Sequence, residues 1–210
     1  MEKKYKFTGE TKRQYGIILQ RIEAIIDFGD VKKGEKGGWI EKEDNLSQVG
    51  NAWISGNARI FGKAIVSEDA RIFGKAWIFE NARIFGKAIV SGDARIFGKA
   101  IVSEDARIFE NARIFGNTWI SGDSWIFGNA WISGNARIFE NARISGDARI
   151  FENAMVSGDA MVFGNAIVFG NTWIYGKIKC EKGYYFARKN KNWKIEEIKI
   201  DDENSVLWHK

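Results

Sequence analysis

Residues 64–75 read AIVSEDARIFGK, and close variants of this string follow one another from residue 52 to residue 177. Cut in sixes from Ala52, this segment gives 21 consecutive hexads without a gap. The first position of a hexad is Ala, replaced only by Thr118, Ser124 and Thr172, and the third position is always Ile or Val. Self-similarity at a short fixed period is the signature of a solenoid. We therefore predict that residues 52–177 form a stack of repeated coils.

The hexads also predict which side chains face inward. Side chains alternate between the two faces of a strand, so the first and third positions share one face and the second position lies on the other. Ala and Ile or Val are expected to fill a narrow apolar core. The second position, which holds Arg, Trp, Ile or Met, is expected to lie on the outer surface.

The last two positions of each hexad indicate a turn. They read GN, GD, GK, EN or ED, and never EK. A tight corner often needs one residue with positive φ, which Gly accepts freely and Asn or Asp accept better than most other residues. On this reasoning each pair must contain such a residue, so Asn or Asp is expected to take the positive φ wherever the fifth position is Glu.

Three residues of strand followed by three residues of turn make a coil with flat sides. This pattern resembles the hexapeptide-repeat proteins, whose fold is a left-handed parallel β-helix with three hexads in each triangular coil. The resemblance implies an all-β, single-stranded parallel β-solenoid of about seven coils, roughly 30–35 Å long. Arginines also recur every twelve residues, at Arg59, Arg71, Arg83, Arg95 and Arg107, which leaves a flat, two-sided coil of twelve residues as the alternative.

The segments on either side of the repeats differ from them. DFGDVKKGEKGGWIEKEDNLSQVGNAWI (27–54) is similar to the segment that leads into the first coil of the YdcK-like hexapeptide-repeat proteins, and GGW and LSQ are its specific parts. Downstream, YYFARKNKNWKIEEIKI (184–200) predicts a hairpin around KNKN. We therefore predict an N-terminal cap (1–51), a hexapeptide-repeat β-helix (52–177) and a C-terminal β-hairpin cap (178–210), with small β caps covering the ends of the coil stack.

Composition and charge exclude several classes of protein. Hydrophobic residues make up 45% of the 210 residues, enough for a packed core, and the single cysteine, Cys180, excludes an intramolecular disulfide. The net charge of +5 is spread as +1, +2 and +2 over the three predicted parts, without a basic patch. No window approaches the length of a membrane span, and MEKKYKFTGETKRQ has no apolar run typical of a signal peptide. We expect a cytoplasmic protein, bacterial or in a phage-infected host cell, with no membrane partner.

The sequence does not carry the catalytic residue that the resemblance implies. Hexapeptide-repeat acyltransferases are expected to use a histidine from a coil as general base, whereas the only histidine here, His209, is next to the last residue. Cys180 has no histidine partner in the coils, and the Asp and Asn residues of the turns are explained by positive φ rather than by metal binding. We therefore predict that the chain is not an enzyme and has no catalytic residues, no cofactor and no metal.

The outer surface is the candidate site. With three hexads per coil, second-position residues stack at intervals of eighteen, and one side and its corner combine arginine with aromatic residues. The candidate interaction surface consists of Arg59, Trp77, Arg95, Arg113, Trp131 and Arg149 on the side and Phe61, Phe79, Phe97 and Phe115 at the corner. Guanidinium groups can stack on indole rings for about 0.5–1 kcal/mol, so a surface that covers itself is the structural alternative. Six outward Trp and twelve corner Phe nevertheless exceed what monomers commonly expose.

Two functions fit such a surface. The first is a non-catalytic β-helical scaffold or interaction protein that binds a partner protein or forms a homo-oligomer, because Trp, Phe and Arg are enriched at interfaces. Since the similar family occurs in bacteria and their phages, inhibition of a host defence protein is one such role. The second is a nucleic-acid-binding module, with Arg on phosphates and Trp on unpaired bases. Acidic turn residues such as Asp69, Asp93, Glu104 and Asp105 favour the first function, and an acyltransferase is disfavoured.

Overall fold

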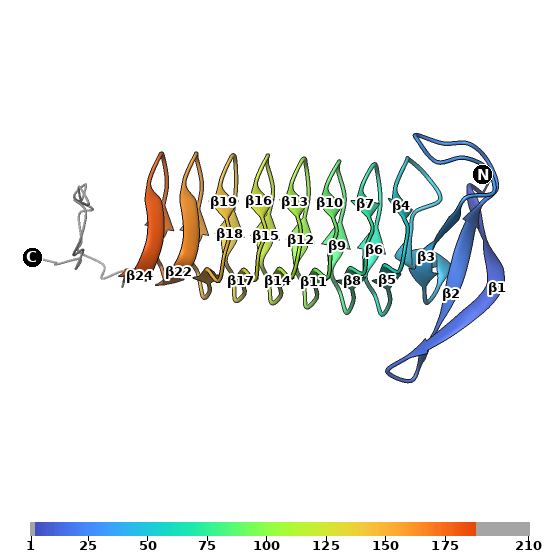
Figure 1. Ribbon diagram of the computed structural model, residues 1–210, viewed down its shortest axis with the longest axis horizontal. Helices are drawn as coiled ribbons and strands as arrows, with labels where there is room; N and C mark the ends of the chain where they lie inside the picture. Colours follow the sequence, from blue (N-terminus) through green and yellow to red (C-terminus); the bar gives the residue numbers. More distant parts are fainter. Residues whose placement is uncertain (1–2, 188–210) are drawn as a thin grey trace, which may run out of the picture.

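The computed structural model describes residues 3–187, which form a rod of stacked β coils with a hairpin across its N-terminal end (Figure 1). Most of the predicted hairpin around KNKN, and His209, lie outside these residues. Apart from one short 3-10 helix, η1 (Glu43–Asn45), the regular structure of the described residues is all β. None of the described residues belongs to a helix long and apolar enough to cross a membrane.

The repeats supply short strands on three sides of the coil. Side 1 contains β4 (Trp53–Ile54), β7 (Arg71–Ile72), β10 (Ile89–Val90), β13 (Arg107–Ile108), β16 (Trp125–Ile126) and β19 (Arg143–Ile144). Side 2 contains β5 (Arg59–Ile60), β8 (Trp77–Ile78), β11 (Arg95–Ile96), β14 (Arg113–Ile114), β17 (Trp131–Ile132) and β20 (Arg149–Ile150). Side 3 contains β6 (Ile65–Val66), β9 (Arg83–Ile84), β12 (Ile101–Val102), β15 (Trp119–Ile120), β18 (Arg137–Ile138), β21 (Met155–Val156) and β23 (Trp173–Ile174). The longer strands β22 (Met161–Gly170) and β24 (Lys179–Ala187) continue from side 1 to side 2.

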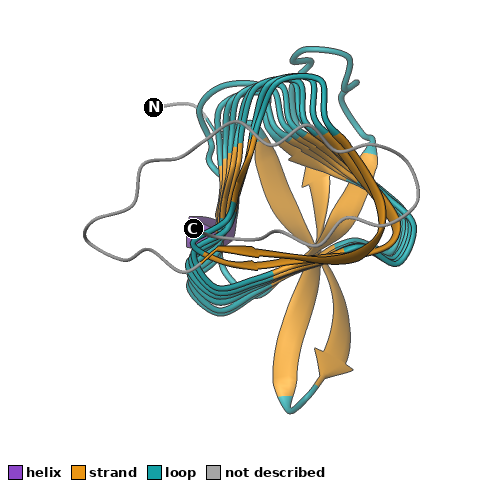
Figure 2. Cartoon of the chain, turned by 90° about the vertical axis from the view of Figure 1, so that its left-hand side faces the viewer, coloured by secondary structure: helices purple, strands orange, loops and turns teal. Residues whose placement is uncertain are grey.

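Parallel pairing at intervals of eighteen residues defines the coil. Arg59 pairs with Trp77 and Trp77 with Arg95, one coil further on. The amide N–H of Arg59 donates to the carbonyl of Ala76 at 2.9 Å, and this pattern recurs from coil to coil. Seen along the rod, the coils superimpose in a triangular outline (Figure 2). The predicted parallel β-solenoid with three hexads per coil is confirmed, and the two-sided coil of twelve residues is wrong. The left hand of the helix stays a prediction.

The core has the composition that the hexads predict. Every first-position and third-position residue from Ala52 to Ile174 is buried. The two threonines that replace Ala satisfy their hydroxyl groups locally, because Thr118 and Thr172 donate to carbonyl oxygens three residues earlier, each at 2.6 Å. The Ser124 hydroxyl has no hydrogen-bond partner within the part of the chain that the structure describes. Small and branched side chains thus alternate along each strand, and the inward assignment of Ala and Ile or Val is confirmed.

The corners correct the prediction about positive φ. The residue with positive φ is the fifth of the hexad, whether it is Gly or Glu, and never the Asn or Asp that follows. The six glutamates concerned have φ of 58–60° and are Glu68, Glu80, Glu104, Glu110, Glu140 and Glu152. In four of the six, the side chain also bonds the next coil: Glu68 Oε2 accepts from the Gly86 N–H at 2.8 Å. Glu104, Glu110 and Glu140 make the same bond to the glycine eighteen residues on.

The sixth position has a different role, which is to connect neighbouring coils through side chains. Asn117 donates to Asn135 at 3.1 Å, Asn135 to Asn153 at 3.0 Å, and Asn153 to Asn171 at 3.2 Å. A similar ladder runs along another corner, where Asn129 donates to Asp147 at 2.9 Å. Asparagine is therefore favoured at the corners for hydrogen bonds along the rod rather than for its backbone conformation.

Glutamates at the fifth position are never stacked on one another. Each of the six has a glycine both eighteen residues before it and eighteen residues after it. The backbones are close at this point: a Cβ added at Gly86 would lie 2.5 Å from the backbone N of Glu104, and one added at Gly74 would lie 2.9 Å from the N of Gly92. Two glutamates one coil apart would also bring two carboxylates together at the strand spacing of about 4.8 Å.

The substitution Gly86→Glu is expected to destabilise the protein more than Gly74→Glu. Both changes create a Glu–Lys pair, but Gly86 lies between Glu68 and Glu104, whereas Gly74 lies between two glycines. Repulsion between stacked carboxylates should add about 1 kcal/mol to the cost of Gly86→Glu. Urea denaturation of both variants measures the difference, which should shrink in 1 M salt. Equal costs at low salt would show that charge does not limit glutamate stacking.

The N-terminal segment joins the coil stack and crosses its end. β1 (Tyr5–Gln14) and β2 (Ile17–Ala24) form an antiparallel hairpin, and β3 (Lys36–Ile40) pairs with β2 on one edge. On its other edge β3 pairs in parallel with β5, so the solenoid ladder begins at Trp39, before the first hexad. The hairpin projects beyond the triangular outline of the coils (Figure 2).

This segment satisfies carbonyl groups of the first coil on all three sides. On side 1 the buried Lys4 Nζ donates to the carbonyls of Gly50 and Ala52, at 3.0 and 2.9 Å. On side 2 the N–H groups of Trp39 in β3 and of Glu41 just after it donate to the carbonyls of Ala58 and Ile60, respectively. On side 3 the Asn45 amide donates to the carbonyls of Gly62 and Ala64, at 3.2 and 2.8 Å. Each side of the first coil thus has donors where the preceding coil would have supplied them.

The pH dependence of stability should report on Lys4. Burial lowers the pKa of Lys4 to about 8, and the nearby Asp69 opposes this shift. Between pH 8 and 10.5 the unfolded chain keeps a proton that the folded chain releases, so the contribution of Lys4 to the free energy of unfolding should rise with pH. Urea denaturation from pH 7 to 10 should therefore show that the wild type gains stability relative to Lys4→Met. A constant or falling difference would contradict the assignment.

Candidate interaction surface

The six predicted side residues form one outward row on side 2. Parallel pairing joins them as consecutive neighbours, in the order Arg59, Trp77, Arg95, Arg113, Trp131 and Arg149. The row runs along the rod because the second position of every third hexad falls on the same side. We call this row, with the corner residues that border it, the side 2 surface.

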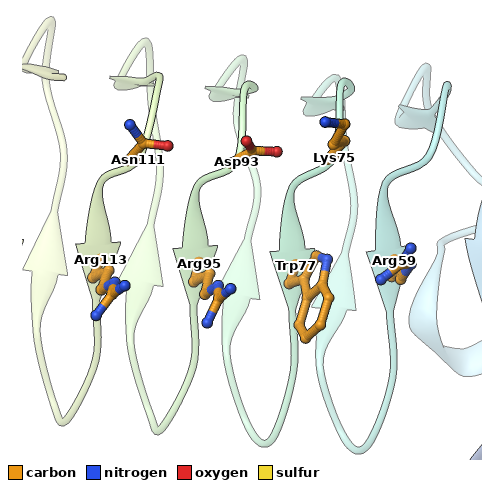
Figure 3. A pocket seen from close by; sticks show the side chains of 7 residues that line it. All are labelled: Arg59, Lys75, Trp77, Asp93, Arg95, Asn111 and Arg113. Carbon is orange, nitrogen blue, oxygen red and sulfur yellow. The ribbon is translucent and has the colours of Figure 1, made fainter. Parts of the chain in front are cut away.

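Arginine and tryptophan side chains in this row stack on one another. The guanidinium carbons of Arg59 and Arg95 lie 4.9 and 5.0 Å from the ring centre of Trp77, one on each flank (Figure 3). Arg113 lies 5.8 Å from the ring of Trp131. Such contacts stabilise exposed sites by about 0.5–1 kcal/mol each. The arginine and tryptophan side chains of side 2 thus cover part of one another's surface, as the structural alternative predicted.

The predicted phenylalanine corner is a continuous stack. Rings of Phe61, Phe79, Phe97 and Phe115 follow one another with centroid distances of 5.1, 4.8 and 5.0 Å and interplanar angles of 7° or less. Phe61 is only 6% exposed and the other three are half-buried. The corner therefore exposes less apolar area than the number of phenylalanines suggests. Its main contribution in the isolated chain is to join successive coils.

The structure adds residues that sequence reasoning missed. A shallow depression on side 2 is lined by Arg59, Lys75, Trp77, Asp93, Arg95, Asn111 and Arg113 (Figure 3). Lys75, Asp93 and Asn111 occupy the sixth position of their hexads, at the corner that precedes side 2. The hexad phase could have indicated them, since each lies two residues before a member of the row.

The tip of the N-terminal hairpin covers one end of the side 2 surface. Tyr15 contacts Trp77 edge-on, with ring centroids 5.6 Å apart. Gln14 Oε1 accepts a hydrogen bond from Arg59 Nη1 at 3.0 Å. The part of the row from Arg95 onward has no such contact with the hairpin among the described interactions. No sequence signal relates residues 14 and 15 to residues 59 and 77.

The arginines of the coils have few acidic partners. Within residues 3–187 one ion pair uses a coil arginine, Arg71 with Asp30 on side 1, at 2.6 Å. No carboxylate lies within ion-pair distance of Arg95, Arg113 or Arg149 in this part of the chain. The guanidinium groups of side 2 thus keep donors available for another molecule.

Exposed tryptophans are found on more than one side. Trp131 on side 2 is 40% exposed, whereas Trp119 and Trp173 on side 3 are 45% and 56% exposed. Trp125 on side 1 is flanked by Arg107 and Arg143, at 5.0 and 5.8 Å from its ring. Exposure of tryptophan therefore does not distinguish side 2, and neither does its depression, since Arg107, Trp125 and Arg143 line a similar one on side 1 together with three aspartates. Side 2 differs in having the most outward arginines, four in its row, and in a depression with a single carboxylate.

No group of three or more potential metal ligands occurs among the residues that the structure describes. Cys180 is buried, and burial raises the pKa of its thiol to about 11, although a hydrogen bond with Tyr185 acts in the opposite direction. At neutral pH the side chain is a thiol rather than a reactive thiolate.

Comparison with known proteins finds a family model that matches the repeats of this chain. The family model described as "YdcK Beta solenoid repeat" matches residues 52–68 and 142–158, both within the coils. The "Uncharacterized acetyltransferase YdcK" of Escherichia coli (strain K12) is 44% identical over a segment that covers 22% of this chain and 18% of that protein. The match thus spans less than a fifth of the relative's length. In its repeats and its stacked parallel coils, the chain is a YdcK-like β-solenoid protein.

Proposed function

We propose that this chain is a non-catalytic scaffold that binds another protein, either a partner or a second copy of itself, through the side 2 surface. One observation carries the proposal: a row of arginine and tryptophan side chains whose guanidinium groups at Arg95, Arg113 and Arg149 have no carboxylate partner within the described residues. Arg and Trp dominate the binding energy of many protein interfaces. A rigid, regular side of a solenoid presents such residues without the entropic cost of ordering a loop.

A catalytic role has less support in this chain. The E. coli relative carries the word acetyltransferase in its name, but the aligned segment covers only 22% of this chain and 18% of that protein. The sequence offers no histidine in the coils to act as general base. The buried Cys180 thiol is a poor nucleophile because its pKa is raised. An acetyl-transfer activity that is lost in His209→Ala would overturn the non-catalytic assignment.

Site-specific photo-crosslinking tests the surface. We expect a benzophenone amino acid that replaces Trp131 on side 2 to give protein adducts in bacterial cells, because this residue lies in the proposed interface. The matched control replaces Trp119 on side 3, which is similarly exposed, and should give at least about fivefold fewer adducts if binding energy concentrates at the interface. The mass of the adduct distinguishes a second copy of the chain from a different partner.

Two results would contradict the proposal. Equal yields from positions 131 and 119 would show that side 2 is not selected over side 3. A complete absence of protein adducts from position 131, with an intact fold by circular dichroism, would show that this surface is not bound by protein.

A further inference from the structure

Arg95 and Arg113 are neighbours in a way that occurs once in the outward rows. In the seven coils of residues 52–177, side 1 reads Trp, Arg, Ile, Arg, Trp, Arg, Met, and side 3 reads Ile, Arg, Ile, Trp, Arg, Met, Trp. Every arginine on those sides has Trp, Ile or Met as neighbour. On side 2, Arg95 pairs directly with Arg113 in the parallel ladder. Neighbouring strands lie about 4.8 Å apart, so two positive charges are adjacent.

This arrangement works against stability. Like charges on directly paired residues are destabilising, and neither guanidinium group has a carboxylate within ion-pair distance among the described residues. The rest of the repeat avoids the problem by placing an indole or an aliphatic side chain between arginines. A position that departs from a regular stabilising pattern points to a binding role.

A tryptophan flanks the arginine pair at each end of it along the row. Trp77 lies against Arg95 and Trp131 against Arg113, at 5.0 and 5.8 Å, so the order along the rod is Trp77, Arg95, Arg113, Trp131. Figure 3 shows the Arg95 and Arg113 side chains side by side, pointing the same way. Stacking restricts each guanidinium plane and leaves its N–H groups free to donate. The two groups are therefore organised before a ligand arrives.

The surroundings favour a single anionic group. Arg59, Lys75, Arg95 and Arg113 line the depression together with one carboxylate, that of Asp93. Two neighbouring guanidinium groups match the two oxygens of a carboxylate through charge-assisted hydrogen bonds. Further along the same corner stands Asp147, which would repel a phosphate chain that followed the rod. These charges suit a short acidic segment better than a nucleic acid.

We propose that the Arg95–Arg113 pair is the anchor for a carboxylate in an acidic segment of the protein that binds side 2, with the exposed Trp131 contacting the apolar atoms beside it and Trp77 holding Arg95 in place. This inference rests on the proposed function and adds the chemistry of the partner. It predicts that the pair is kept for binding at the expense of stability.

Binding is tested by fluorescence anisotropy at low ionic strength, with a dye-labelled peptide that carries one Glu-Glu pair flanked by leucines as probe. The variant Arg95→Gln/Arg113→Gln should bind at least tenfold more weakly than the wild type. The control Arg83→Gln/Arg137→Gln removes the same charge from side 3 and should lower affinity by less than threefold. Equal losses in both variants, or no binding to the wild type, would overturn the proposal. The same assay is run with an oligothymidylate of equal charge. If it binds more tightly than the peptide, and if its binding is lost in Arg95→Gln/Arg113→Gln, the ligand of the pair is a nucleic acid and not an acidic protein segment.

A double-mutant cycle on stability tests the premise that the two arginines repel each other in the free protein. Because the two arginines repel each other, Arg113→Gln should be less destabilising, or more stabilising, when Arg95 is present than when position 95 is already Gln. A coupling of zero or of the opposite sign would overturn the inference. Photo-crosslinks from position 131 that persist in the Arg95→Gln/Arg113→Gln variant would refute the anchor alone, whereas their absence in the wild type would refute the proposed function.

Discussion

The backbone conformation at the fifth position of each hexad is the constraint on which the rest of this structure depends. Positive φ there turns the chain through a corner every six residues, and three such corners close a coil of eighteen. Coils then stack at the strand spacing, so fifth-position backbones lie against each other, as the short distances to an added Cβ at Gly86 and Gly74 show. Glycine meets both demands. Glutamate also occupies six of these positions, and in four of them its carboxylate accepts an N–H from a glycine in the next coil.

Because the corners fix eighteen residues per coil, the outward side chains are arranged in rows along the rod. Equivalent side chains are repeated along the rod, and each type stabilises its own kind of ladder: phenylalanine rings stack, asparagine amides donate to the next amide, and arginine lies on tryptophan. These ladders cover much of the aromatic surface. The clearest departure from this regularity is the pair of adjacent arginines, Arg95 and Arg113, in the outer row of side 2.

The N-terminal segment links the stability of the rod to its candidate site. The carbonyls of the first coil accept hydrogen bonds from this segment on each of the three sides, from Lys4, from β3 and from Asn45. The hairpin that follows Lys4 reaches along side 2, where Tyr15 and Gln14 contact Trp77 and Arg59. A single segment thus closes the N-terminal end of the ladder and limits the free part of the side 2 surface to the coils beyond it.

The hexad pattern by itself determined the solenoid and its inward Ala and Ile or Val residues, because strand alternation and a strict period are local properties. It grouped Arg59 to Arg149 in one row only for a coil of eighteen residues. It did not determine which corner residue takes positive φ, since the fifth-position glutamates adopt it in the stacked coils although Asn or Asp follows them. The choice between coils of twelve and eighteen residues also needed the tertiary pairing, because both periods fit the arginine spacing. Likewise, the self-covering of the phenylalanine corner and the hairpin over Trp77 depend on contacts between distant segments. Local sequence encodes the turn and the strand, whereas packing across coils decides which side chains stay exposed.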